Sequence, residues 1–288
     1  MANPVIIGCV ESAPLLIVDG DNLAHRAYHS TPKTVTGVDG FPINAIVGFF
    51  SMLFNVWQRE RPGSIFVAWD TLGVDTYRSE LWPPYQTGRI FEPEIVRQLD
   101  LLPPICRTFG FGVGKEAGYE ADDLMASAAL AVDPGTTGLI LTTDRDAYQL
   151  VSDRVSVLAP KRGSPEPDRI GPHEVVERLG VLPEQVPDYK ALAGDPSDKI
   201  PGVRGIGPKA AANLLLKHGT LEAVLSAWGD HPEAERALIF RKVVQMRPMA
   251  GMVLDCGEPD YQAGVEALRA LGANAVADRI CALTRRDV

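Results

Sequence analysis

Short apolar runs alternate with longer apolar segments along the first 160 residues of the chain. Four apolar runs have the length of a buried strand. They are residues 15–18 (LLIV), SIFVAW before Asp70, GLILTT before Asp144, and RVSVLA. Residues 44–58 (NAIVGFFSMLFNVWQ) are too long for a strand and predict a largely buried helix. Two more helices are predicted, one over 93–110 and one from about Glu120 to Val132. Strands that alternate with helices indicate a parallel α/β sheet covered on both faces.

Pro and Gly residues punctuate this pattern. Pro103-Pro104 should kink or split the helix predicted over 93–110. Residues 160–172 form a connector rich in Pro and Gly. Beyond it, the pattern predicts a helix, a Gly-rich hairpin, a second helix and a further short helix, and residues 229–288 look helical.

Acidic residues recur where the apolar runs end. They are Asp19, Asp70, Glu120, Asp122, Asp123, Asp144, Asp146, Asp195 and Asp198. In a parallel sheet the functional crevice lies outside the carboxyl ends of the strands, so these side chains should converge there. Any one of them has a simpler interpretation, since acids also cap helices and start turns. Helix capping and turn formation do not explain why all nine acids recur at the ends of the apolar runs.

Converging carboxylates need a cation. Two unit charges ~4 Å apart interact by about 4 kcal/mol at an effective dielectric constant near 20. Oxygen ligands without His or Cys suit Mg²⁺ or Mn²⁺. Two such ions are a recurring device for hydrolysing phosphodiesters, because they activate water and stabilise the charge that develops on the phosphate.

The Gly-rich hairpin has a second candidate chemistry. It contains Gly202, Arg204, Gly205, Gly207 and Lys209. Glycines allow close approach to a phosphate, the following helix offers free amides, and Lys209 adds a positive charge. Such contacts hold a DNA backbone without reading the bases. The alternative is a plain helix-turn-helix packing unit.

Composition changes this picture only slightly. The formal net charge of −9 argues against a polyanionic partner, but nine metal-bound acids of the 37 would leave 28 to balance the 28 Lys and Arg. Four widely spaced cysteines indicate reduced thiols in a cytoplasmic protein. The first residues do not have the pattern of a secretory signal, and no apolar stretch reaches the ~20 residues that span a bilayer.

Six motifs together resemble one family. DGDNLAHRAYH, FPINAIVGFF, VAWD, YEADDL, TTDRDAYQLV and GDPSDKIPGVRGIGPKAA are similar, in order and spacing, to the bacterial 5′-nuclease family, which comprises the 5′→3′ exonuclease domain of DNA polymerase I and free-standing flap endonucleases. The resemblance implies a PIN-like α/β nuclease core over 14–185 with a helical arch at about 76–100. It also implies a helix-three-turn-helix DNA-binding module over 186–228, followed by a helical extension over 229–288.

The resemblance also assigns residues. It implies that the nine acids hold the metal ions, that Arg26 contacts the substrate phosphate, and that the carbonyls of Pro201, Val203 and Ile206 hold K⁺. Tyr85 and Arg89 match an arch motif in which Gln86 stands where the family usually has a catalytic lysine. We therefore expect Arg78 or Arg89 to supply part of the missing charge. Arg145 in TDRD replaces a common lysine and keeps the charge.

The sequence leaves three functional hypotheses. The first is a monomeric, cytoplasmic, metal-dependent nuclease of DNA replication or repair that acts on 5′ flaps and on 5′ ends of duplex DNA. The second, motivated by Gln86, is a DNA-binding protein with weak or lost catalysis. The third is a PIN-type ribonuclease, which would need no hairpin module.

Overall fold

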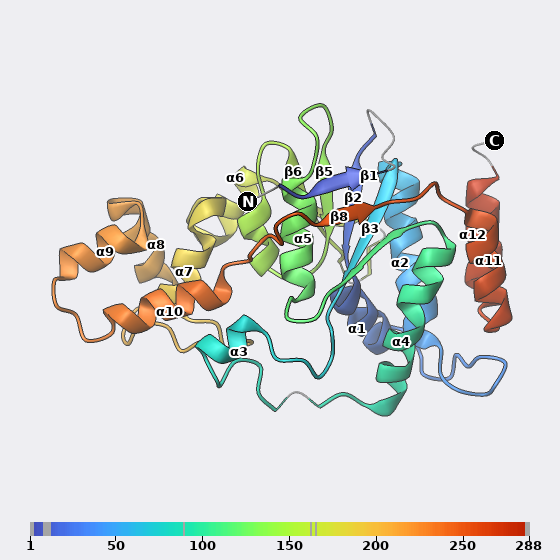
Figure 1. Cartoon of the computed structure of the whole chain (residues 1–288), viewed down its shortest axis with the longest axis horizontal. Helices are drawn as coiled ribbons and strands as arrows, with labels where there is room; N and C mark the ends of the chain where they lie inside the picture. Colours follow the sequence, from blue (N-terminus) through green and yellow to red (C-terminus); the bar gives the residue numbers. More distant parts are fainter. Residues whose placement is uncertain (1–2, 8–12, 89, 162, 165, 286–288) are drawn as a thin grey trace.

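The computed structural model describes residues 3–7, 13–88, 90–161, 163–164 and 166–285. The predicted site residue Arg89 lies outside them. A six-stranded sheet forms the centre of the molecule, in the order β4-β3-β2-β5-β6-β7 (Figure 1). Its strands are β2 (Leu15–Asp19), β3 (Ser64–Trp69), β4 (Gly112–Lys115), β5 (Gly138–Leu141), β6 (Val155–Ala159) and β7 (Asp168–Ile170). All pairings are parallel except β6 with β7, so the predicted parallel α/β sheet is confirmed.

Helices cover both faces of the sheet. Successive residues of β2 alternate between two hydrophobic layers, Leu15 and Ile17 facing one and Leu16 and Val18 the other. The first layer includes residues of α5 (Ala121–Leu130), and the second is built from α1 (Gly20–Ser30), α2 (Asn44–Glu60) and α4 (Pro93–Thr108). Because both layers are buried, β2 is fixed in register, and its last residue is held at the carboxyl edge.

The arch region starts from the edge where β3 ends. The short helix α3 (Tyr77–Leu81) is followed by turns over 83–88, and the start of α4 lies further along the chain (Figure 1). The 3-10 helix η1 (Asp146–Leu150) follows β5 at the same edge.

A second lobe lies at one end of the molecule. It contains α6 (Pro172–Leu179), the 3-10 helix η2 (Pro183–Gln185), α7 (Val186–Ala193), α8 (Pro208–His218), α9 (Leu221–Trp228) and α10 (Ala234–Val244). From α10 the chain returns across the sheet through β8 (Val253–Asp255), which pairs in parallel with β1 (Val5–Ile7). It ends in α11 (Tyr261–Ala270) and α12 (Asn274–Thr284) at the opposite end (Figure 1).

Three sequence-based expectations need correction. The Pro103-Pro104 pair does not split α4, which is one helix from Pro93 to Thr108. The region 229–288 is not all helical, since it contributes β8. Strands β4 and β7 were not predicted, because they are short and carry no clear apolar run.

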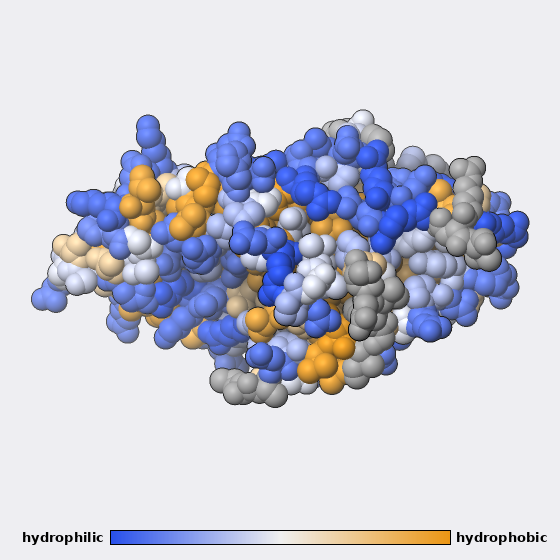
Figure 2. Space-filling model, turned by 90° about the horizontal axis from the view of Figure 1, so that it is seen from above, coloured by the Kyte–Doolittle hydropathy of each residue, from blue (hydrophilic) through white to orange (hydrophobic). Residues whose placement is uncertain are grey.

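The surface bears little continuous apolar area in the view of Figure 2. Hydrophilic side chains dominate this face, and the apolar ones form small separate patches. None of the helices in the described ranges is long and apolar enough to span a bilayer.

Candidate active site

An open cleft of about 1020 Å³ lies at the carboxyl edge of the sheet. Six of the nine predicted acids line it, namely Asp19, Asp70, Glu120, Asp122, Asp144 and Asp198. Arg26 and Gln86 line the same cleft, as predicted, and so does Asp21, which the sequence reasoning did not select. The structure therefore brings residues from β2, β3, α5, the β5–η1 connection and the loop after α7 to one place.

Hydrogen bonds fix the first carboxylate of the cleft. Asp19 ends β2 and caps α1, where its Oδ1 accepts a bond from the backbone N–H of Asn22 at 3.1 Å. Its Oδ2 accepts a bond from the hydroxyl of Thr142 at 2.7 Å, from the end of the neighbouring strand β5. Because both oxygens are anchored, Asp19 has a defined orientation at the cleft floor.

The next strand positions Asp70 in a similar way. Asp70 Oδ1 accepts a bond from the backbone N–H of Ala121 at 2.7 Å, which ties the end of β3 to the first turn of α5. Its own backbone N–H donates to Asp21 Oδ2 at 2.7 Å. Asp21 thus belongs to the same cluster, and its position two residues after Asp19 in DGDN was the available signal.

Glu120 connects the acidic helix to the arch. It is the N-cap residue of α5, and its Oε1 and Oε2 accept bonds from Thr76 Oγ1 at 2.7 Å and Tyr85 Oη at 2.9 Å. Gln86 Nε2 donates to Tyr85 Oη at 2.7 Å and to Asp198 Oδ1 at 3.3 Å. The predicted residues Tyr85 and Gln86 therefore contact carboxylates of the site directly.

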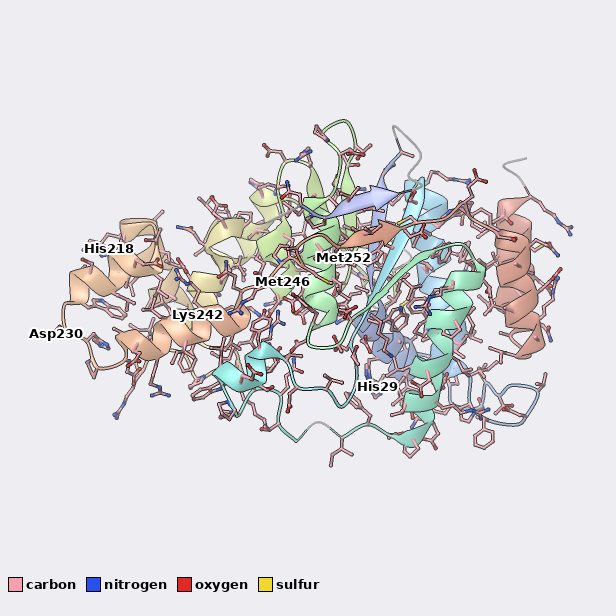
Figure 3. The ribbon with its side chains drawn as sticks, viewed as in Figure 1. His29, His218, Asp230, Lys242, Met246 and Met252 are labelled. Atoms are coloured by element: carbon pink, nitrogen blue, oxygen red, sulfur yellow. The ribbon has the colours of Figure 1, made fainter. Side chains whose placement is uncertain are left out.

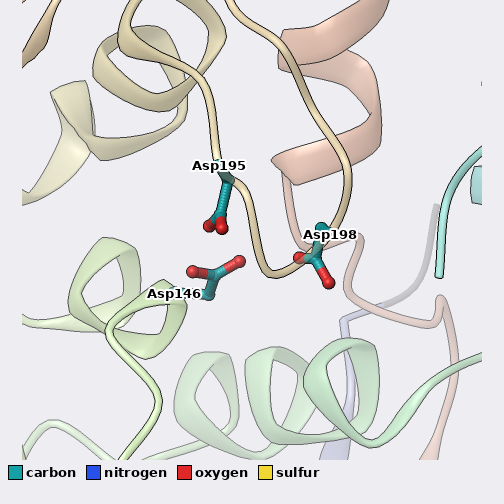
Figure 4. Close-up of side chains that lie close together, drawn as sticks. All are labelled: Asp146, Asp195 and Asp198. Carbon is teal, nitrogen blue, oxygen red and sulfur yellow. The ribbon is translucent and has the colours of Figure 1, made fainter. Parts of the chain in front are cut away.

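A second acidic group adjoins the cleft. Asp146, Asp195 and Asp198 each offer an oxygen within 4.8 Å of the others (Figure 4). Lys190, which the sequence reasoning missed, contacts the Asp146 carboxylate and donates to Asp195 Oδ2 at 2.5 Å. Its place on α7, five residues before Asp195, could have indicated this pairing. Asp198 also lines the cleft and so joins the two groups.

Burial makes the cleft carboxylates hard to ionise. It raises the pKa of Asp19 to about 7, against the lowering effect of the bonds from Thr142 and Asn22. Burial likewise raises the pKa of Asp21, Asp122 and Glu120. At Asp195 burial is outweighed by the Lys190 charge and by bonds from Lys190 and Ser197, so its pKa lies below the usual value.

The donor set of the cleft suits a hard divalent cation. Seven carboxylates line it, but among its described lining residues Arg26 and Lys161 are the only Lys or Arg side chains. The carboxylate oxygens are the ligands that Mg²⁺, Mn²⁺ and Ca²⁺ prefer, and they outnumber the two imidazoles, His25 and His29, that also line the cleft. The cleft and the adjoining acidic group could therefore hold metal ions.

Two predicted site residues lie elsewhere. Asp123 is fully buried, and its carboxylate forms a bidentate pair with Arg78 at 2.7 and 2.8 Å. Arg78 is 2% exposed, and neither residue lines the cleft. The expected role of Arg78 in replacing the missing lysine charge is therefore not supported, because its guanidinium is paired inside the protein, and Asp123 adjoins the cleft acid Glu120, whose backbone N–H donates to its Oδ2 at 3.3 Å, without lining the cleft itself.

The predicted hairpin lies between α7 and α8. Arg204, Gly205, Gly207 and Lys209 are exposed there, whereas Gly202 is buried. Gly207 precedes the first turn of α8 as its N-cap residue, so the free amides of that turn are next to the exposed surface. The carbonyl of Val203 accepts a bond from the N–H of Ile206 at 3.0 Å. The backbone N–H of Arg204 in this hairpin donates to Glu233 Oε2 at 2.7 Å, and phosphate binding by the hairpin stays a prediction.

Two family models match the chain. The 5′-3′ exonuclease N-terminal resolvase-like domain matches residues 14–180, and the 5′-3′ exonuclease C-terminal SAM fold matches residues 181–253. The 5′-3′ exonuclease of Aquifex aeolicus is 36% identical over 217 residues, which cover 74% of this chain and 73% of that protein.

Other relatives are longer or more distant. DNA polymerase I of Mycobacterium tuberculosis (strain H37Rv) is 39% identical over 251 residues, or 84% of this chain, but the chain spans only 27% of that relative's length. A flap endonuclease of bacteriophage T5, solved as a pseudo-enzyme-product complex with DNA and metal ions, has a similar fold. Its TM-score is 0.63 at 21% identity, with 94% of this chain and 99% of that one covered.

Proposed function

Because this chain belongs to the 5′-3′ exonuclease family, we propose that it hydrolyses phosphodiester bonds of DNA at 5′ flaps and at 5′ ends of duplexes. The observation that carries this proposal is the convergence of the predicted acids from five chain segments on one open cleft. The solved T5 complex with DNA and metal ions supports the same substrate class.

The proposed cofactors are two Mg²⁺ or Mn²⁺ ions. One would be held by cleft acids such as Asp19, Asp70 and Asp122, the other by Asp146, Asp195 and Asp198, where it would take the place of the Lys190 ammonium that contacts Asp146 and Asp195. When bound, such ions lower the pKa of a coordinated water and offset charge on the phosphate.

The other residues hold and orient the substrate. Arg26 on the cleft wall pairs with the phosphate next to the cut, and Gln86 donates a hydrogen bond from the arch side. Lys209 and the amides at the start of α8 hold the duplex backbone without reading bases. The carbonyls of Pro201, Val203 and Ile206 are the proposed K⁺ ligands in that hairpin.

We assign the protein to DNA replication or repair, since the relatives named above are DNA-processing enzymes, and from the sequence alone we propose that it is a cytoplasmic monomer. The proposed units are the nuclease core with its arch over 14–185, the DNA-binding module over 186–228 and the extension over 229–288.

The ribonuclease alternative is less well supported, because the chain carries the hairpin module. The alternative of a DNA-binding protein with weak or lost catalysis is not proposed, because six of the predicted acids converge on the cleft whatever Gln86 contributes.

A flap-cleavage assay tests this function. A duplex with a labelled 5′ flap, incubated with the protein and Mg²⁺ or Mn²⁺, should release the flap, and chelation by EDTA should stop the reaction. Asp122→Asn removes one cleft charge at nearly constant shape and should reduce the rate by at least about 100-fold. Cleavage that persists in EDTA, or an unaffected Asp122→Asn variant, would overturn the proposal. An otherwise identical RNA flap distinguishes the ribonuclease alternative.

A further inference from the structure

The first foot of the arch, α3, is held by helix α10 of the second lobe. Arg78 on α3 donates from Nε to the carbonyl of Val243, near the end of α10, at 3.0 Å. Trp82, directly after α3, packs edge-on against Phe240 of α10, with ring centroids 5.0 Å apart. The arch therefore begins from a packed support rather than from a free loop.

The same arginine connects α3 to the acidic helix α5. Its two terminal nitrogens donate to the two oxygens of Asp123, and the pair is almost completely excluded from water. A bidentate Arg–carboxylate pair fixes both distance and orientation, which a lysine could not do. Arg78 Nη1 also lies 3.7 Å from Glu120 Oε2, so the pair adjoins a carboxylate of the cleft.

The segment that follows α10 completes this cluster. The backbone N–H of Arg247 donates to Asp123 Oδ1 at 2.8 Å, and its guanidinium lies 3.8 Å from the ring centre of Tyr77. The Tyr77 hydroxyl is within bonding distance of Asp123 Oδ1 and of the Gln245 carbonyl, at 3.1 and 3.0 Å. Figure 3 shows Met246 on this segment, between the end of α10 and α5.

These contacts occupy both oxygens of Asp123. Oδ1 is approached by Arg78, Tyr77 and Arg247, and Oδ2 by Arg78 and by the backbone N–H of Glu120 at 3.3 Å. The side chain has no exposed surface. A metal ion could reach Asp123 only by displacing a buried guanidinium, which would leave that charge unpaired at high cost.

We propose that Arg78 and Asp123 are positioning residues, whose buried pair locks the arch foot and the segment 243–249 onto α5. Through this lock Glu120, Tyr85 and Gln86 are held at the cleft. Asp123 acts on the arch and not as a metal ligand. The inference rests on the proposed nuclease function only where cleavage rates are measured. The metal-binding and hydrogen-exchange measurements do not depend on that function.

The test compares two neighbouring acids. Asp123→Asn should leave Mn²⁺ affinity, followed by calorimetry, within about twofold of the parent protein, whereas Asp122→Asn should weaken it at least about tenfold. Amide hydrogen exchange over 76–88 should be at least about fivefold faster in Asp123→Asn, because the arch foot opens. Flap cleavage should fall by about 100-fold, the scale on which a displacement of ~1 Å slows an enzyme.

A double substitution distinguishes a positioning role of Asp123 from a role as a metal ligand. Arg78→Met combined with Asp123→Leu removes both charges, so that neither is left buried without its partner, and it should cleave at least about tenfold faster than Asp123→Leu alone. Arg269→Met, which breaks an exposed pair with Asp278, is the control and should not change exchange over 76–88. If single variants do not fold, Tyr77→Phe, which loses one hydroxyl, should still accelerate exchange there.

Several results would overturn the inference. They are Mn²⁺ binding weakened equally by Asp123→Asn and Asp122→Asn, unchanged exchange over 76–88, or a double variant no faster than Asp123→Leu. If the parent protein cleaved no DNA, the nuclease proposal would fail, while Mn²⁺ affinity and hydrogen exchange would still decide the role of Asp123.

Discussion

Gln86 is the residue whose chemistry departs most from the family pattern. Its amide lies on the cleft and donates to Asp198 and Tyr85, so a longer cationic side chain at this position would face the same carboxylates. A charged donor stabilises developing negative charge more strongly than a neutral one. We expect Gln86→Lys to raise the single-turnover cleavage rate by about tenfold. Gln86→Met is the matched control and should lower it.

Asp19 makes the metal-free protein sensitive to pH. Its folded-state pKa of about 7 lies above the ordinary value of 3.8, so the folded state binds the proton more tightly than the unfolded state does. Its contribution to the free energy of unfolding is therefore full below pH 3.8 and is lost as pH rises toward 7. The metal-free protein should melt at a lower temperature at pH 8 than at pH 5.5.

Divalent cations should reverse this trend. Because Mg²⁺ competes with protons for the same carboxylates, the increase in melting temperature that it causes should be larger at pH 8 than at pH 5.5. Differential scanning fluorimetry with Mg²⁺ and with EDTA measures both effects. An equal increase at the two pH values would contradict the assignment of Asp19 to the metal site.

The sequence predicted six of the seven carboxylates that line the cleft but not the orientation of each. Asp19, Asp70 and Asp144 follow strands of one parallel sheet, and that topology brings them together. Asp122 and Asp123 are adjacent on α5, where successive side chains diverge by about 100°, so only one of them faces the cleft. Arg78 could not be assigned from the sequence, because its partners lie 45 and 165 residues away.

The hairpin between α7 and α8 depends on glycine at one position more than at another. Gly202 has φ +69°, and a Cβ there would lie 2.4 Å from the backbone nitrogen of Gly194. Gly207 has φ −90° and open space around it. Gly202→Ala should therefore cost about 2 kcal/mol or more of stability and weaken duplex binding. Gly207→Ala should change stability by less than about 1 kcal/mol.

Urea denaturation and a fluorescence-anisotropy titration with duplex DNA measure these effects. Equal losses in the two variants would show that the hairpin geometry does not depend on the buried glycine.

Tertiary packing and pairing account for the helix and strands that the sequence pattern predicted wrongly or missed. In α4, Leu99, Leu102 and Ile105 are buried in the core, and this packing keeps one helix through two prolines that remove backbone donors. Strand β4 (GVGK) shows no apolar run, and β8 is defined by its pairing with a distant segment, so a local pattern could not identify either.

At the scale of the whole molecule, the C-terminal segment ties the two ends together. Leu254 in β8 is fully buried, whereas its neighbour Val253 is 55% exposed. Leu254→Ala should therefore lower the free energy of unfolding by about 3 kcal/mol, whereas Val253→Ala should change it by about 0.5 kcal/mol or less. The midpoint of urea denaturation measures both. Similar midpoints for the two variants would mean that β8 adds little to the core.

The course of that segment bears on how the protein can be shortened for experiments. A fragment that ended at Trp228 would retain the cleft acids and the hairpin, and by sequence it would seem a complete catalytic unit. It would nevertheless lack Val243, which accepts a bond from Arg78, and the strand that holds Val5–Ile7. Anyone who trims this protein to its recognisable motifs should expect a loosened arch beside an intact set of cleft carboxylates.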